Sequence, residues 1–183
     1  MKKLTVFVSV LVIVFALGSS RVSAMDISTF IGYNYADSEL NDAVEDIYGS
    51  DAVGGVGWGF ELWFGESLQY GLGIGVLQQH EVDYDFISYS FSLMPIMVNL
   101  RYYIFGGLYG GAGIGFLYGL FSDSEGNYDD SGGNMVGIQF MAGYDFILAD
   151  LLIIGVTLRY TIGFEDEMEY HNFTPAITVG IRF

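Results

Sequence analysis

The chain of 183 residues has no cysteine, two prolines and only six lysines or arginines. The lack of cysteine excludes a scaffold held by disulfides. The scarcity of basic residues leaves no basic patch for nucleic acid, which 22 acidic residues would repel. No segment after Ala24 has 18 uninterrupted apolar residues, so we expect no membrane-spanning helix there.

Residues 1–24 have the pattern of a secretory signal peptide. Lys2 and Lys3 form a basic start, an apolar stretch follows, and small residues ending at Ala24 supply a cleavage site. We therefore expect an exported bacterial protein whose single domain spans residues 25–183.

Apolar residues alternate with small or polar residues over residues 152–164. Leu152, Ile154 and Val156 begin the apolar parity, while glycine, threonine and Arg159 occupy the other. Because side chains alternate between the two faces of a strand, one face is continuously apolar. In a soluble sandwich the opposite face would carry Lys and Glu. The pattern instead indicates a membrane strand with lipid outside and a packed lumen inside.

The same alternation recurs along the chain and predicts eight strands. They cover residues 27–35, 56–64, 68–76, 96–102, 108–118, 136–146, 152–164 and 173–183. Short links, which we place on the periplasmic side, alternate with longer ones. The short links are 65–67, 104–107 and 147–150. The predicted fold class is all-β, an eight-stranded antiparallel up-and-down transmembrane β-barrel.

The apolar parity changes once inside an expected strand. Apolar positions are odd up to Leu93 and even from Met94 onward. A β-bulge produces such a change, and Pro95, which cannot donate to the ladder, lies beside it. We therefore predict a bulge over Leu93–Pro95.

Two short runs, the first with two tyrosines and the second rich in glycine, and the end of the chain complete the pattern. The runs are Asn99-Leu-Arg-Tyr-Tyr103 and Tyr109-Gly-Gly-Ala-Gly-Ile-Gly115, and Phe183 follows Arg182 at the end. The chain resembles the small bacterial outer-membrane β-barrel superfamily, the opacity-protein, OmpA and OmpX-like group, with OmpW-like proteins close by. This resemblance implies a monomer in the outer membrane, beside lipopolysaccharide or another outer-leaflet lipid. It also implies that the barrel-assembly machinery reads Phe183 as an assembly signal, and it implies no enzyme.

Charged residues occur on the inward parity of the expected strands. Four of them lie near periplasmic strand ends: Glu61, Arg101, Asp145 and Arg182. Arg159 faces inward nearer the middle. Since an eight-stranded lumen is only wide enough for side chains to fill it, we expect the first four to meet. They form either a structural ion-pair plug or a gate whose partners exchange to open a narrow pore.

Acidic residues gather in the expected outer loops. Four segments, 37–52, 80–88, 121–133 and 164–172, hold 17 of the 22 acids and no Lys or Arg. This composition is typical of a solvated surface. Divalent cations, which prefer clustered oxygen ligands, or a basic surface partner are the alternatives. The run Asp123–Asp130 alternates oxygen ligands but lacks the glycine placement of an EF-hand.

Signals for catalysis are weak. The two histidines, His80 and His171, lie at loop bases, and no serine stands at a spacing that singles out a dyad or triad. We expect no enzyme and no cofactor. The pattern favours a structural or surface-interaction role, adhesin-like, with a plugged lumen. Apolar residues on the inward parity leave an alternative open, a narrow channel for small, including hydrophobic, solutes, as the OmpW-like resemblance implies.

Overall fold

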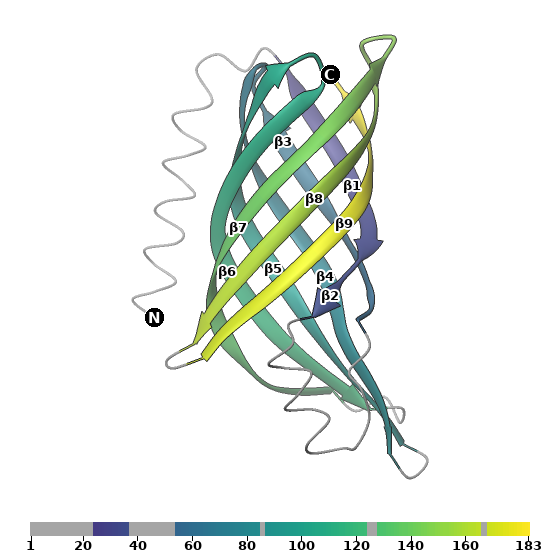
Figure 1. The fold of residues 1–183 in the computed structure, drawn as a ribbon, viewed down its shortest axis with the longest axis vertical. Coiled ribbons are helices and arrows are strands. Elements are labelled where there is room, and N and C mark those ends of the chain that lie inside the picture. The colour runs from purple at the N-terminus through teal and green to yellow at the C-terminus, as the bar shows by residue number, and fades with distance from the viewer. Residues whose placement is uncertain (1–23, 37–53, 85–86, 124–127, 166–167) are drawn as a thin grey trace.

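The computed structural model describes residues 24–36, 54–84, 87–123, 128–165 and 168–183 (Figure 1). Its strands are β1 (Met25–Tyr33), β2 (Tyr35–Ala36), β3 (Val56–Phe64), β4 (Leu68–Tyr84), β5 (Ile87–Phe105), β6 (Leu108–Asp123), β7 (Tyr128–Leu148), β8 (Leu152–Glu165) and β9 (Met168–Arg182). β1 and β2 are two parts of one strand, interrupted at Asn34. Within these ranges, no helix is long and apolar enough to cross a membrane.

The strands form one closed antiparallel barrel. Each strand pairs with its neighbour in the chain, and β1 pairs with both β3 and β9. At this closing seam Asp26 lies opposite Arg182 and Gly32 opposite Ala176. The predicted eight-stranded fold is confirmed. A closed barrel leaves no unpaired sheet edge, which is the condition for a β-structure in lipid.

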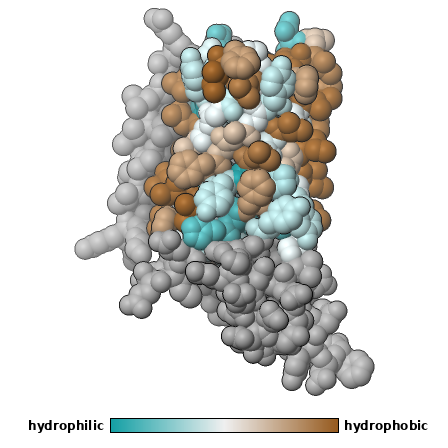
Figure 2. All heavy atoms as spheres, in the orientation of Figure 1, coloured by the Kyte–Doolittle hydropathy of each residue, from teal (hydrophilic) through white to brown (hydrophobic). Residues whose placement is uncertain are grey.

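The two faces of the barrel wall have the predicted character. On β8, Val156 and Leu158 are 55% and 52% exposed, whereas Thr157 and Arg159 are 2% and 4% exposed. Figure 2 shows hydrophobic side chains over much of the outer surface of the barrel. The alternation therefore separates a lipid-facing band from a filled lumen.

Large side chains fill the lumen by packing over glycines. A Cβ on Gly71 would lie 2.7 Å from the Trp63 ring, and one on Gly59 would lie 2.6 Å from the Phe30 ring. The buried hydrophobic residues form two groups: Phe30, Leu77, Leu93, Tyr170 and Ala176 in one, and Trp63, Tyr109 and Met141 in the other. The described lumen is therefore packed by its own side chains.

The predicted bulge over Leu93–Pro95 is wrong. β5 pairs with β6 in unbroken register from residue 89 to residue 103. Leu93 is completely buried and belongs to the hydrophobic group that contains Phe30 and Leu77. The register of β4 and β5 shifts farther out, between Gln78 and His80 on β4. The change of apolar parity instead marks the point, at Met94, where β5 begins to carry apolar residues on its outward side, while Pro95 and Met97 continue its buried side.

Three expected outer loops are mostly strand. Only residues 85–86, 124–127 and 166–167 separate β4 from β5, β6 from β7 and β8 from β9. The acidic composition of these segments predicts loops. A hairpin that projects into water, however, can carry polar residues on both faces. The expected loop 37–52 and residues 1–23 of the expected signal peptide 1–24 lie outside the described residues.

The short links gather at the end of the barrel where the C-terminus lies (Figure 1). They are residues 65–67, as predicted, and residues 106–107 and 149–151, which are slightly displaced from the predicted 104–107 and 147–150. Gly65 and Gly106 have positive φ, and so do Ala149 (φ 52°) and Asp150 (φ 55°). Two consecutive left-handed residues make the backbone of a type I′ turn, which favours Asn-Gly. Ala149 and Asp150 therefore hold a strained conformation.

Replacing this pair by Ala149→Asn/Asp150→Gly should raise the free energy of unfolding by about 1 kcal/mol, because both new residues tolerate positive φ. Urea titration of the protein folded in lipid vesicles measures the change. Gly106→Ala is the converse variant and should lower stability, since Gly106 has a φ of 53°. A loss of stability in the Asn-Gly variant would contradict the left-handed geometry of this link.

Val156→Arg should lower the free energy of unfolding by about 2–4 kcal/mol, because it places a charge near the middle of the apolar band. The control is Leu151→Arg in a short link, where the residue is 52% exposed and the expected cost is about 0–1 kcal/mol. Equal costs in a refolding titration would show that β8 does not present Val156 to lipid.

Candidate functional site: a luminal charge network

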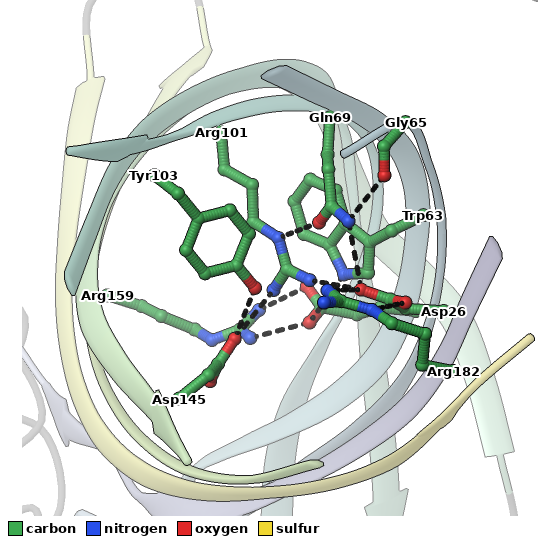
Figure 3. A network of polar contacts seen from close by, with 10 residues as sticks. Asp26, Trp63, Gly65, Gln69, Arg101, Tyr103, Asp145, Arg159 and Arg182 are labelled. Carbon is green, nitrogen blue, oxygen red and sulfur yellow. Dashed lines mark hydrogen bonds and ion pairs between the residues drawn. The ribbon is translucent and has the colours of Figure 1, made fainter. Parts of the chain in front are cut away.

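Six charged residues meet inside the barrel, each from a different strand. They are Asp26 on β1, Glu61 on β3, Arg101 on β5, Asp145 on β7, Arg159 on β8 and Arg182 on β9. The three arginines are the only lysines or arginines in residues 25–183. All six side chains are at least 95% buried except that of Arg182, which is 21% exposed. Figure 3 shows most of this network around the lumen.

Asp26 is the acceptor at the centre of the network. Its Oδ1 accepts from Arg182 Nε at 2.7 Å, and its Oδ2 accepts from Arg182 Nη2 at 2.8 Å. The same Oδ2 accepts from Gln69 Nε2 at 2.9 Å and from Arg101 Nη2 at 3.2 Å. Two cations and an amide from three strands thus converge on one carboxylate with no exposed side-chain surface.

The guanidinium of Arg101 lies between Asp26 and Asp145 (Figure 3). Its Nε donates to Gln69 Oε1 at 2.6 Å, and its Nη1 is 3.6 Å from Asp145 Oδ2. The Trp63 ring stacks against it at 4.2 Å, and the rings of Tyr103 and Tyr109 lie at 5.3 Å and 5.2 Å. A planar guanidinium suits this combination of forked hydrogen bonds and aromatic faces.

Glu61 and Arg159 form a second, two-pronged ion pair. Arg159 Nη1 donates to Glu61 Oε1 at 2.7 Å, and Nη2 donates to Oε2 at 2.9 Å. The Phe30 ring covers the Arg159 guanidinium at 3.9 Å. Trp63 Nε1 donates to Glu61 Oε2 at 3.4 Å, so the indole links this pair to the ring-stacked Arg101. Such bidentate pairs are among the stronger charge-assisted contacts.

The structure pairs the four predicted site residues differently from the expected single cluster. All four face the lumen, and Arg101 approaches Asp145 as expected. Glu61, however, pairs with Arg159, which we had placed apart, and Arg182 pairs with Asp26. Strand tilt explains this, because residues at equal distances from their strand ends do not share one level of a barrel.

Sequence reasoning missed Asp26, Gln69 and Tyr103. Asp26 precedes the outward Ile27, so the alternation predicts that Asp26 faces inward. The expected strand begins at residue 27, however, and therefore leaves Asp26 out. Gln69 has the same inward parity on β4. Tyr103 donates its hydroxyl to Asp145 Oδ2 at 2.6 Å, a contact between β5 and β7 that periodicity does not reveal.

The remaining predicted residues lie away from the network. Phe183 is 64% exposed, and its backbone exchanges hydrogen bonds of 2.8 Å and 3.1 Å with Met25 at the seam. His171 Nδ1 is 2.9 Å from the Tyr160 hydroxyl, and the two rings stack. The side chain of His80 lies outside the described residues. In the part of the chain that the structure describes, no three His, Asp or Glu side chains form a metal site.

Comparison with known proteins shows similarity of structure. No protein-family model matches the chain, and no curated protein sequence matches it. Neisserial surface protein A is 10% identical with a TM-score of 0.63, covering 88% of this chain and 99% of its own. The chain has the fold of the small outer-membrane β-barrels.

Two further solved structures share this barrel fold. Ail, the attachment invasion locus protein of Yersinia pestis, in complex with the heparin analogue sucrose octasulfate, is 16% identical with a TM-score of 0.58, covering 87% and 98%. The N-terminal β-barrel domain of Pseudomonas aeruginosa OprF is 12% identical with a TM-score of 0.51, covering 88% and 98%. The resemblance inferred from the sequence is confirmed at the level of the fold.

Asp26→Ala should lower the free energy of unfolding by about 3–5 kcal/mol, because the buried Arg101 and the partly exposed Arg182 lose a shared carboxylate. Removing Arg182 as well should cost less than the sum of the single changes. Chemical denaturation of the unaltered barrel, the two single variants and the double variant gives the four unfolding free energies of this double-mutant cycle. Glu66→Ala, an exposed acid in a short link, is the control and should change stability by less than about 0.5 kcal/mol. Strict additivity would contradict the Asp26–Arg182 pair.

A second double-mutant cycle tests which charged residues form direct ion pairs. Glu61 and Arg159 should show a coupling of about 1–3 kcal/mol, since they share two direct hydrogen bonds. Glu61 and Arg182, whose direct partners differ, should couple more weakly. The same denaturation measurement covers both pairs, and a stronger coupling of Glu61 to Arg182 would restore the single cluster expected from the sequence.

Proposed function

We propose that the protein is exported to the bacterial outer membrane, where it acts as a structural and surface-interaction barrel, adhesin-like, with a closed lumen. The observation that carries this proposal is the luminal charge network. Three carboxylates balance three guanidiniums within it, and aromatic rings pack against the central arginine. Residues 1–24 would be removed during export.

The network supports a closed barrel because of what an ion would have to displace. Arg101 is bound to Asp26 and Gln69, approaches Asp145 and is covered by the rings of Trp63 and Tyr109. Moving one member would leave its partner charged and poorly solvated, which is costly. A plug of this kind leaves the outer surface as the part of the protein that can meet other molecules.

The charge of the outer segments supports a cationic partner. Segments 37–52, 80–88, 121–133 and 164–172 have 17 acids and no Lys or Arg. Such a surface attracts divalent cations or a basic partner and repels polyanions. Ail was solved with a sulfated heparin analogue; for this chain we propose the opposite preference. Lipopolysaccharide or another outer-leaflet lipid would surround the barrel, and the assembly machinery would read Phe183.

Conductance in planar bilayers tests the closed lumen. The refolded protein should give no resolved current steps, because the network blocks the narrow lumen. Trp63→Ala/Arg101→Ala is the positive control, since it removes the central cation and the ring stacked on it. Well-resolved steps from the unaltered protein would contradict the plug and favour the alternative, a narrow channel for small solutes.

Binding to oligolysine and to sucrose octasulfate tests the surface. The barrel in nanodiscs should bind oligolysine in a salt-sensitive manner and show no binding of the sulfated sugar. Changing the acids at 165, 166, 167 and 169 to amides should weaken oligolysine binding several-fold. The matched control changes Glu66 and Asp150, which lie in short links at the opposite end of the barrel. Preference for the sulfated sugar would contradict the proposed partner class.

A further inference from the structure

A small cavity with polar and apolar walls lies in the lumen beside the Glu61–Arg159 pair. Its polar lining comes from Glu61, Asn99, Gln139 and Arg159, and the Phe30 ring forms part of its wall. The space open to the centre of a water molecule is about 10 Å³. That volume corresponds to about one water. The cavity is therefore too small for an organic ligand and large enough for a solvent molecule.

Asn99 brings two unpaired polar atoms to this cavity. The residue is 2% exposed, and neither Nδ2 nor Oδ1 has a hydrogen-bond partner among the residues that the structure describes. Its amide lies over two glycines of the adjacent strands. A Cβ on Gly113 would lie 1.9 Å from Asn99 Oδ1, and one on Gly73 would lie 3.2 Å from Nδ2. Because glycine has no side chain, these two positions leave room for the Asn99 amide.

Gln139 and Arg159 each contribute one further unpaired atom. Gln139 Nε2 donates to Thr161 Oγ1 at 3.1 Å, and its Oε1 is buried without a partner. Arg159 gives both terminal nitrogens to Glu61, and its Nε is buried without a partner. Gln139 and Asn99 are both in register with Gly113, so the two amides occupy one row across β5, β6 and β7.

These groups comprise two donors, Asn99 Nδ2 and Arg159 Nε, and two acceptors, Asn99 Oδ1 and Gln139 Oε1. Leaving such atoms unpaired in a buried place is costly. A bare cation would satisfy only the acceptors, and a bare anion only the donors, whereas water both donates and accepts. We propose that this cavity is a binding site for an internal water molecule that bridges Asn99 to Gln139 and to Arg159 Nε.

The site goes beyond the proposed function, because it would exist whether or not the plug conducts ions. It places a water molecule in the lumen against the Phe30 ring, which belongs to the hydrophobic group of Leu77 and Leu93. The bridging water would also join Asn99 on β5 to Gln139 on β7, a connection that no direct hydrogen bond supplies across Gly113.

Nuclear magnetic resonance of the deuterated, ¹⁵N-labelled barrel in nanodiscs tests this site. The side-chain amide protons of Asn99 should show cross-relaxation with a long-lived water. Gly113→Ala should abolish the signal, because the added methyl drives the Asn99 amide into the cavity. Gly110→Ala is the matched control: it lies on the same strand, its Cβ would meet nothing within 4 Å, and it should keep the signal.

Gln139→Leu removes the acceptor Oε1 and leaves Gly73 and Gly113, which make room for Asn99, unchanged. This variant therefore tests the bridging water if Gly113→Ala does not fold. It should weaken or abolish the water signal at Asn99. Three results would overturn the proposal: a direct contact between the Asn99 and Gln139 amides with no water signal in the unaltered protein, a signal that survives in the Gln139 variant unchanged, or a signal lost equally in the Gly110 control.

Discussion

A β-sheet in lipid must satisfy all of its backbone hydrogen bonds within itself, and this protein does so by closing β1 onto β9. Closure into eight strands leaves a lumen that side chains can fill, and the alternation of the strands then decides the place of each residue. Along the lipid-facing band the outward side chains are mainly apolar, and the charged side chains point inward. The charge network is therefore a consequence of the closed wall, since every inward charge needs a partner within that narrow space.

Asp26 connects the closing seam to the opposite wall. It lies on β1, pairs with Arg182 on β9, and reaches Gln69 on β4 and Arg101 on β5. A buried ion pair is weak evidence for stability, because desolvation offsets much of its attraction. Its clearer effect here is on register: a one-residue slip between β1 and β9 would turn Asp26 or Arg182 toward lipid. The seam therefore has one register that keeps both charges paired.

The alternation of the sequence predicts the barrel wall well, because a period of two is a local property that each strand carries by itself. Outward Val156 and inward Thr157 follow from it directly. Contacts across the lumen do not, since they depend on strand tilt: Glu61 meets Arg159 on a strand far away in the chain. The bulge predicted over Leu93–Pro95 is wrong because apolar character alone does not distinguish a lipid-facing residue from a residue of the lumen core, where Leu93 lies. Polar outer hairpins were likewise taken for loops.

The confinement of all three arginines of residues 25–183 to the lumen affects how the protein meets trypsin. Trypsin cuts only after lysine or arginine. The bonds after Arg101 and Arg159 lie within paired strands, and the bond after Arg182 joins the end of β9 to Phe183, whose backbone is hydrogen-bonded to Met25. Intact barrels should persist in the protease, while unfolded chains lose their strands at three places. Residues 25–183 also contain no lysine, so a lysine introduced by design would be the only side-chain amine of this domain for acylating reagents.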